Sequence, residues 1–307
     1  MTQYDDNVEN PPLEGDATRK MEVPLGGSAK ELLAVPSLTG LATGFYELFP
    51  GMPTPTLFRE MISEFFGVFL IVQMGTGTVC SAIFSGDIYG GAQTGVWQIA
   101  VVWGIAVVIA VGMAGPVSGA HLNPAMTIAL ALFRKFPKSK ILWYIEAQLL
   151  GAMAAAFVNL RLFAGVIRKY ESKHGFQRGS EQSYLSARAF GEYPTIGIGR
   201  AFFAEALGTA ILAFVIFALT NPKNETTRKY SAILVPTTIG ATVACLLSVL
   251  GPLTQCGLNP ARDFGPRIVA SIAGWGPVAM KLWWLYICAP IVGAIVGALL
   301  SDVVLYI

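Results

Sequence analysis

Apolar residues along the chain form six stretches of membrane-spanning length, separated by shorter polar segments. A helix that crosses the hydrocarbon core of a bilayer needs about 20 predominantly apolar residues. The stretches that reach this length cover residues 57–83, 96–114, 141–165, 200–220, 231–250 and 282–304. The pattern therefore predicts an all-α polytopic membrane protein with six transmembrane helices.

Two further apolar segments, 116–133 and 252–271, are too short and too interrupted to span a membrane, and each has Asn-Pro near its middle. Asn is a strong helix N-cap, and Pro is well tolerated in the first turn of a helix. Each segment is expected to form a loop, a cap at Asn123 or Asn259, and a half-length helix. Irregular backbone at membrane depth is tolerated only where protein buries it or where it lines a wet cavity. We therefore predict two re-entrant half-helices, ending near Phe133 and Ser271.

The chain contains an internal repeat. Leu-Asn-Pro-Ala occurs at 122–125 and again at 258–261. Further matches surround Glu64 and Glu205, each of which follows an Arg by five residues and precedes a Gly by three. Each half holds three spans and one half-helix, and an odd number of spans inverts the second half relative to the first. We predict an inverted 3+3 repeat over about 57–165 and 200–304, with a connecting loop at 166–199.

Four glycines recur at matching places in the repeat and are expected to permit close helix crossing. They are Gly67, Gly151, Gly208 and Gly293.

Composition agrees with a membrane protein, because only 13% of the residues are charged whereas soluble domains carry about 25%. Residues 1–55 are more polar and are predicted to be an N-terminal cytoplasmic tail, largely disordered. Within them, residues 32–49 form either an interfacial linker or a segment that packs on one mouth of the protein. Residues 56–307 form the membrane domain.

Basic residues mark the cytoplasmic side. Segments 134–140 and 223–229 are basic, whereas 85–95 holds Asp87 and neither Lys nor Arg. The positive-inside rule then places both termini in the cytoplasm, although the long 166–199 connection is also basic. Asn224-Glu225-Thr226 fits a glycosylation pattern, but on this topology it is cytoplasmic and unmodified.

Several classes of function are disfavoured. The net charge of +2 indicates no nucleic-acid partner. The chain has only two histidines and no cluster with metal-ligand spacing, so we expect no metal, no cofactor and no enzyme activity. The four cysteines are interpreted as free, small apolar residues: Cys80, Cys245, Cys256 and Cys288.

With His-Leu-Asn-Pro-Ala at 121–125 and Leu-Asn-Pro-Ala-Arg-Asp-Phe-Gly-Pro-Arg at 258–267, the chain resembles the major intrinsic protein family, the aquaporins. Asp263 after Arg262, Gly-Pro-Leu-Thr at 251–254 and Ala-Gly-Trp-Gly at 273–276 resemble the aquaglyceroporin, or glycerol facilitator, branch. The resemblance implies an aquaporin-like channel domain at 56–307. It also implies a homotetramer with one pore per subunit. We expect the protein to be integral to the plasma membrane.

The paired motifs have a physical role in such a pore. Two half-helices that meet N-terminus to N-terminus each place about half a positive charge near the midplane, which repels cations and protons. The side-chain amides of Asn123 and Asn259 can donate hydrogen bonds into the lumen. The resemblance also implies a row of pore carbonyls from the loops before the caps. They belong to Gly119, Ala120, His121, Thr254, Gln255 and Cys256.

The narrow filter of the family maps to Trp103, Leu247, Cys256 and Arg262. A charge at this depth is a functional candidate by default, with a structural Arg bonded to a carbonyl as the alternative. Trp103 fits the glycerol pattern as an apolar wall opposite the Arg donors. Glycerol channels usually have Gly and Phe in place of Leu247 and Cys256. Tyr286 also departs from the glycerol-channel pattern, because an aromatic residue at this position is typical of water-selective members of the family.

Other polar residues allow two interpretations. Glu64 and Glu205 are either structural braces for the loop amides or proton-relay groups, and their symmetry favours braces. Asp263 is interpreted as a brace for nearby donors rather than a solute ligand. His121 is either a pH-sensing gate or a fixed neutral ring, and we favour the ring.

The sequence therefore predicts a passive channel that conducts water and glycerol or similar small polyols and excludes ions and protons. The alternative is a water-selective pore, or a broader one for urea, ammonia or peroxide. A coupled transporter is less favoured, because Glu64 and Glu205 are the only candidate buried acids. The partners expected are the solutes, the lipid bilayer and further copies of the chain.

Overall fold

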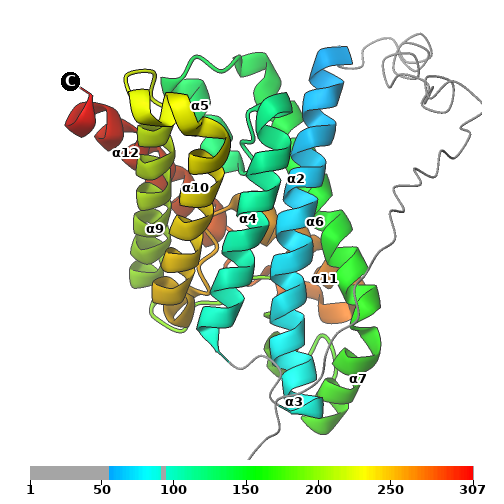
Figure 1. The fold of residues 1–307 in the computed structure, drawn as a ribbon. Helices are drawn as coiled ribbons and strands as arrows, with labels where there is room; N and C mark the ends of the chain where they lie inside the picture. Colours follow the sequence, from blue (N-terminus) through cyan, green and yellow to red (C-terminus); the bar gives the residue numbers. More distant parts are fainter. Residues whose placement is uncertain (1–54, 91–94, 307) are drawn as a thin grey trace, which may run out of the picture. The chain divides into compact units, whose positions relative to one another are not determined.

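The structure is a computed structural model that describes residues 55–90 and 95–306. The predictions for the tail before residue 55, including segment 32–49, lie outside the described residues. All regular structure in the described part of the chain is helical (Figure 1).

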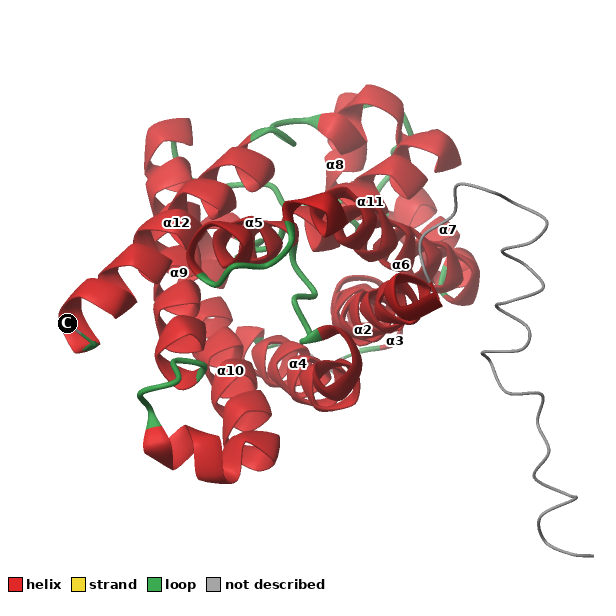
Figure 2. Ribbon diagram, turned by 90° about the horizontal axis from the view of Figure 1, so that it is seen from above, coloured by secondary structure: helices red, strands yellow, loops and turns green. Residues whose placement is uncertain are grey.

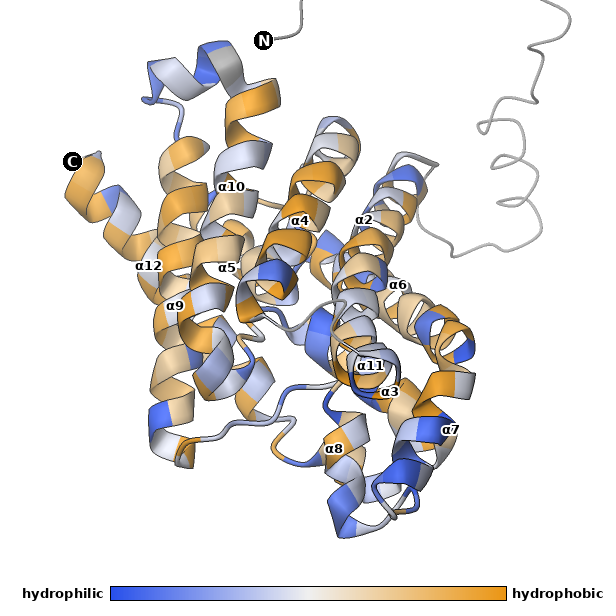
Figure 3. Ribbon diagram, turned by 60° about the horizontal axis from the view of Figure 1, so that its bottom comes forward, coloured by the Kyte–Doolittle hydropathy of each residue, from blue (hydrophilic) through white to orange (hydrophobic). Residues whose placement is uncertain are grey.

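Six long apolar helices confirm the predicted spans. They are α2 (Pro55–Cys80), α4 (Val96–Ser118), α6 (Ile141–Leu162), α9 (Ile198–Leu219), α10 (Glu225–Thr254) and α12 (Leu285–Leu305). After α2 the chain continues through a π-turn (Ser81–Ser85) into the short α3 (Gly86–Tyr89). Figure 3 shows hydrophobic residues along these helices and hydrophilic ones near α7 and α8. The start of α2 and the end of α12 lie at the same end of the bundle, as six spans require (Figure 1).

The two predicted half-helices are present as α5 (Pro124–Phe133) and α11 (Pro260–Ala270). Each starts with Pro in its first turn, and the preceding Asn caps it through its side-chain oxygen. Both lie within the bundle, where α5 is beside α12 and α11 is beside α6 (Figure 2). The all-α fold with re-entrant half-helices is therefore as predicted.

Three element boundaries differ from prediction. Helices α4 and α10 continue through Pro116 and Pro252 to Ser118 and Thr254, because a helical proline removes only one backbone hydrogen bond. Helix α10 also starts earlier than predicted, since the Asn224 side chain accepts from Thr227 N–H at 3.1 Å and caps it. The asparagine of the glycosylation pattern is thus a helix cap.

The connection predicted as a loop at 166–199 is partly helical, so that prediction was wrong in detail. It contains most of α7 (Ala164–Lys173) and the short α8 (Tyr184–Ala187). Hydrophobic residues of this connection are buried with those of the π-turn after α2, of α6 and of the segment after α11. Because α7 also carries many polar residues, its buried residues do not form a continuous apolar stretch, so the sequence pattern did not predict this helix.

Packing between helices follows the inverted repeat. Helix α2 packs on α4 and α6, and α9 packs on α10 and α12 in the same way. Each half-helix packs against the last helix of the other repeat, α5 on α12 and α11 on α6. Helices α4 and α10, which are equivalent in the two repeats, pack on each other. The two halves are thus interlocked rather than merely adjacent.

The repeated glycines serve two different purposes. A Cβ at Gly151 would lie 2.2 Å from the carbonyl oxygen of Phe65, and one at Gly293 would lie 2.1 Å from that of Ala206. These two glycines permit close helix crossing, as predicted. Gly67 and Gly208 instead make room for side chains, because a Cβ there would lie 2.3 Å from Leu122 Cδ2 and 2.8 Å from Leu258 Cδ2.

Gly297 provides a test of the crossing between α9 and α12. A Cβ at this position would lie 2.0 Å from the carbonyl oxygen of Ala210, so Gly297→Val must push the helices apart. We expect a loss of about 1–3 kcal/mol, the usual cost of overpacking. Thermal unfolding of the purified protein in detergent measures it. Gly199→Ala is the control, because no atom lies within 4 Å of its added Cβ. Equal unfolding temperatures for the two variants would contradict the prediction.

Candidate functional site

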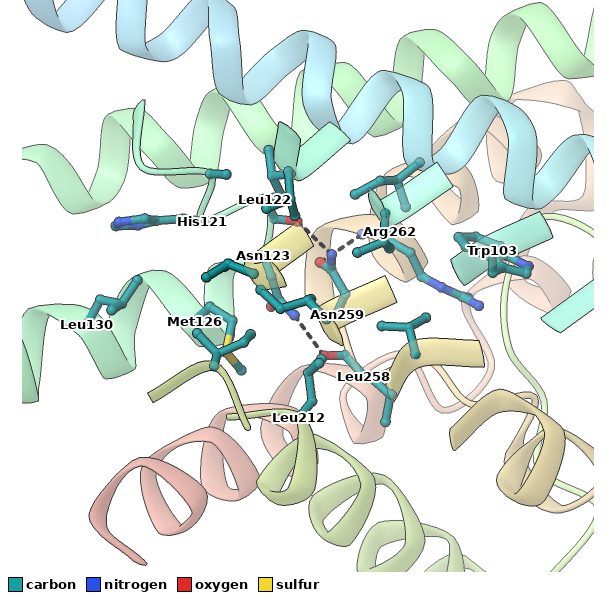
Figure 4. A pocket seen from close by; sticks show the side chains of 18 of the residues that line it. Trp103, His121, Leu122, Asn123, Met126, Leu130, Leu212, Leu258, Asn259 and Arg262 are labelled. Atoms are coloured by element: carbon teal, nitrogen blue, oxygen red, sulfur yellow. Dashed lines mark hydrogen bonds between the residues drawn. The ribbon is translucent and has the colours of Figure 1, made fainter. Parts of the chain in front are cut away.

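The two Leu-Asn-Pro-Ala loops are joined by reciprocal hydrogen bonds at the centre of the bundle (Figure 4). The Asn123 amide donates to the carbonyl oxygen of Leu258 at 2.9 Å, and the Asn259 amide donates to that of Leu122 at 2.7 Å. The amide oxygens meanwhile accept from the first backbone N–H groups of α5 and α11. A primary amide has two N–H donors, so each asparagine retains one beyond the crossed bond.

Both loops hold backbone in the left-handed region. The φ angles are +52° at Ala120 and +50° at Leu122, and +61° and +55° at the equivalent Cys256 and Leu258. For residues with a Cβ this region costs roughly 1–2 kcal/mol each. Such a conformation persists only where its surroundings hold it.

Glu64 and Glu205 hold these loops through backbone amides. Glu64 accepts from the N–H groups of His121 at 2.9 Å and Leu122 at 2.7 Å. Glu205 accepts from those of Gly257 at 3.0 Å and Leu258 at 2.9 Å. Both carboxylates are fully buried. Their oxygen lone pairs are directed at the backbone N–H groups of the loops.

Glu64 has two further donors, of which only one has a counterpart at Glu205. Ser118 Oγ donates to it at 2.6 Å and the Gln148 amide at 2.7 Å. The loop on this side is therefore fastened to α4 and α6 as well as to α2. At Glu205 the counterpart of Ser118 is Thr254, which also hydrogen-bonds the carboxylate, whereas Pro290 takes the place of Gln148 and has no side-chain donor.

A pair of tyrosines caps the helices that lead into the loops. Tyr144 Oη donates to the carbonyl oxygen of Ser118 at 3.0 Å, and Tyr286 Oη donates to that of Thr254 at 2.9 Å. Ser118 and Thr254 are the last residues of α4 and α10, so their carbonyls have no helical donor. In the sequence, Tyr286 stood out only because glycerol channels usually have a different residue at this position. In the structure, Tyr286 makes the same hydrogen bond in the second repeat that Tyr144 makes in the first.

A cavity of about 380 Å³ runs past the crossed asparagines. Its lining is mostly apolar and includes nine of the residues singled out in the sequence. These are Trp103, Gly119, Ala120, His121, Asn123, Leu247, Cys256, Asn259 and Arg262. Thr254 and Gln255 do not line it, and their role as pore carbonyls stays a prediction. Glu64, Glu205 and Asp263 are also outside the lining, behind the loops.

Arg262 lies at one end of this cavity, held by three groups. Its guanidinium carbon is 4.1 Å from the ring centre of Trp103, and Nη2 donates to the carbonyl oxygen of Cys256 at 3.4 Å. Nη1 forms an ion pair with Glu192. The sequence predicted Trp103 as a wall opposite Arg262, but the guanidinium lies over the ring, because a cation is attracted to the face of an indole. Gly75 makes room, since a Cβ there would lie 2.3 Å from the indole.

The backbone of Glu192 is itself clamped from both sides. Asp263 Oδ1 accepts from Glu192 N–H at 2.8 Å, and the Arg267 guanidinium donates to the Glu192 carbonyl oxygen. Arg267 Nε also donates to Asp263 Oδ2 at 2.7 Å. The clamp fixes the carboxylate that pairs with Arg262. Sequence analysis missed Glu192, because nothing in the connecting segment distinguishes it from an ordinary surface acid.

His121 lies at the other end of the same lining and is held on several sides. Its Nδ1 is 3.2 Å from Thr127 Oγ1, and its ring packs against those of Phe136 and Tyr144 at 4.4 and 4.8 Å. These contacts fix the ring orientation.

Arg134 also lines the cavity, beyond His121, and the sequence analysis missed it as a site residue. It follows α5 directly and forms two hydrogen bonds of 2.6 Å with the Asp302 carboxylate on α12. Asn221 donates to the same carboxylate at 3.3 Å. The cavity therefore has an arginine at each end, and each arginine is paired with an acid.

Within the described residues, no three His, Cys, Asp or Glu side chains are grouped to hold a metal ion. The polar groups of the site are amides, carbonyls and paired charges. Such a set can exchange hydrogen bonds with a neutral solute.

The tyrosine caps can be tested by removing one hydroxyl. Tyr286→Phe leaves the buried Thr254 carbonyl without a donor, which costs about 1–3 kcal/mol. We expect a lower thermal unfolding temperature in detergent, and a similar loss for Tyr144→Phe. Tyr184→Phe is the control, because Tyr184 is exposed. An unfolding temperature for Tyr286→Phe equal to that of the control would show that the bond contributes nothing.

Comparison with known proteins agrees with this geometry. A family model described as major intrinsic protein matches residues 52–301. The glycerol uptake facilitator protein of Pseudomonas aeruginosa is 41% identical over 254 residues, which cover 80% of this chain and 88% of that protein. The propanediol uptake facilitator PduF of Citrobacter freundii is 39% identical, covering 79% and 90%.

A solved structure extends the likeness to the fold. The aquaglyceroporin from Plasmodium falciparum is 28% identical and superposes with a TM-score of 0.70, over 81% of this chain and 97% of that one. The six spans, the inverted repeat and the match over most of the length leave one conclusion: the chain is an integral membrane protein and belongs to the major intrinsic protein family.

Proposed function

We propose that the protein is a passive channel that conducts glycerol and similar small polyols together with water, and that excludes ions and protons. The observation that carries this proposal is the cavity itself. It runs past two opposed, asparagine-capped half-helices, and apart from a few polar groups its lining is apolar. The similarity to glycerol and propanediol facilitators supports the same solute class.

Exclusion of charge is proposed to arise at the crossed asparagines. The N-termini of α5 and α11 each contribute about half a positive charge there. The remaining N–H of each amide can donate to a passing hydroxyl oxygen. A neutral solute gains hydrogen bonds at this point, whereas a cation meets a positive potential. The loop carbonyls on either side would accept from its hydroxyl hydrogens.

Selection by size is proposed to occur at Trp103, Leu247, Cys256 and Arg262. Arg262 supplies donors to solute oxygens, while the other three contact carbon-bound hydrogens. A dehydrated hydroxyl without a new partner costs a few kcal/mol, so the donors decide which solutes enter. Glu64, Glu205 and Asp263 act as braces that hold the backbone carrying these groups.

Coupled transport is disfavoured, because the two buried acids are already engaged in hydrogen bonds and do not face the cavity. Glu64 and Glu205 are fully buried and bonded to loop amides, and neither lines the cavity. Moving a proton to them would break the contacts that hold the loops. Assembly as a homotetramer in the plasma membrane belongs to the same proposal.

Transport in proteoliposomes tests the function. We expect glycerol and water fluxes about tenfold above those of empty vesicles, independent of any ion gradient, because a preformed pore needs no driving ion. Stopped-flow light scattering measures both. Glycerol flux at the empty-vesicle rate with fast water flux would indicate a water-selective pore. A flux that requires an ion gradient would indicate a coupled transporter.

A matched pair of variants on α10 shows whether flux uses this cavity. Val243 lines the cavity, whereas Val249 is 69% exposed on the outer face. Val243→Trp should block both fluxes, and Val249→Trp should leave them near the wild-type rate. Equal fluxes through the two variants would place the pathway elsewhere.

Mercurial inhibition tests the position of the filter. Cys256 lines the cavity beside Arg262, so a mercury ion bound to its thiol should obstruct the narrow part. We expect mercuric chloride to inhibit glycerol flux and Cys256→Ser to abolish the inhibition. Cys245 and Cys288 are exposed thiols outside the lining. Inhibition that persists in Cys256→Ser would assign the block to another thiol.

A further inference from the structure

A second cavity, of about 560 Å³, lies beside the Arg134 end of the main cavity. It is bounded by the last turns of α4, the turn between α9 and α10, and the first turns of α10, and it is partly open to the outside. Four residues line both cavities: Val111, Gly119, Thr220 and Val235. The second cavity, named here the side chamber, therefore adjoins the main cavity.

The side chamber exists because α4 and α10 diverge. The two helices are closest at Gly104 and Gly240, where a Cβ on Gly240 would lie 2.4 Å from the carbonyl oxygen of Gly104. Two turns further along α4, Gly112 and Gly115 have no atom within 4 Å of an added Cβ. Both of these glycines line the chamber. The wedge between the helices is thus open at the Arg134 end of the bundle.

Two prolines leave backbone carbonyls without helical donors in the helices that bound this wedge. Pro116 and Pro236 lie inside α4 and α10, and both line the chamber. A proline has no N–H, so the carbonyl four residues earlier loses its helical donor. Those carbonyls belong to Gly112 and Ala232, which also line the chamber. Each of the two helices therefore has, among the residues that line the chamber, one carbonyl without a helical donor.

Donors lie on the same walls. Ser231 and Arg228 line the chamber, and neither side chain has a hydrogen bond or ion pair with another residue in the described part of the chain. The Ser231 hydroxyl both donates and accepts, and the guanidinium only donates. Acceptors and donors on opposite sides of one cavity suit a ligand whose groups do both. Polyols have that property, because each hydroxyl donates one hydrogen bond and accepts others.

We propose that the side chamber is a polyol-binding site adjoining the inner mouth of the channel. The ligand class rests on the proposed function, since the main cavity would deliver polyols to the chamber. An anionic lipid headgroup or free phosphate would pair with Arg228, but the two carbonyl oxygens would repel it, whereas a hydroxyl suits the guanidinium, Ser231 and both carbonyls. A polyol held here is one step from the conduction pathway and contributes to saturation of flux from that side.

Protection of a chamber thiol tests the proposal without relying on transport. Ser231→Cys places a thiol on the chamber wall, and the full-length protein in detergent is labelled with a methanethiosulfonate reagent. Peptide mass spectrometry reads the rate at position 231 separately from the native cysteines. We expect glycerol or erythritol to slow labelling about threefold at a concentration of twice Kd, by mass action. Sucrose at the same osmolality controls for solvent effects.

Two variants make the readout specific. Glu225→Cys puts a thiol on the exposed first turn of α10, outside the chamber lining, and its labelling should not respond to polyol. Gly112→Val projects into the open space of the chamber, so adding it to Ser231→Cys should abolish protection. Protection that survives Gly112→Val would place the polyol elsewhere and overturn the proposal.

The remaining outcomes separate the chamber from the channel. Absent protection in a Ser231→Cys protein that still conducts glycerol overturns the chamber and leaves the proposed function intact. Protection in a protein without glycerol flux supports the chamber and refutes the function. Protection by nanodiscs of anionic phosphatidylglycerol, relative to zwitterionic phosphatidylcholine, without any response to polyol would identify a lipid site instead.

Discussion

The fold depends on two carboxylates that hold irregular backbone at membrane depth. The loops before α5 and α11 expose amides and carbonyls where no bulk water is available. Two residues in the first loop and three in the second have positive φ despite carrying a Cβ. Glu64 and Glu205 accept hydrogen bonds from the backbone N–H groups of the loops, and these bonds fix the direction of the loop carbonyls. A buried carboxylate is itself unfavourable, so the loops stabilise the acids as much as the acids stabilise the loops.

Because the same device occurs twice, any difference between the two ends of the cavity comes from positions where the repeats differ. The repeat equivalents of Trp103, Leu247, Cys256 and Arg262 are Ile239, Val111, Ala120 and Met126. All eight residues line the cavity. The four equivalents are apolar, and only the set with Arg262 contains a charge. Equivalent sets of four residues thus lie on both sides of the asparagines, and only one set contains a charged side chain.

Local signals made most of the fold predictable. Asn-Pro followed by an apolar run specifies a cap and a helix start within a few residues, so α5 and α11 were located correctly. Long-range pairing was not predictable in this way. Glu192 and Asp302 are single acids in unremarkable contexts, and only the folded chain shows that they face Arg262 and Arg134. The end of α4 was misjudged because a proline near a C-terminus does not stop the helix.

Arg262 shows how the unrepeated part of the chain completes the site. A buried guanidinium requires a counter-charge, and breaking a buried ion pair costs about 3–5 kcal/mol. The repeat provides no such acid near Arg262, because Asp263 is already bonded to Arg267 and to the backbone of Glu192. The acid comes instead from the connecting segment between the repeats, and Asp263 and Arg267 fix its backbone. The two repeats therefore supply most of the cavity lining, while the connection between them supplies the counter-charge of its buried arginine.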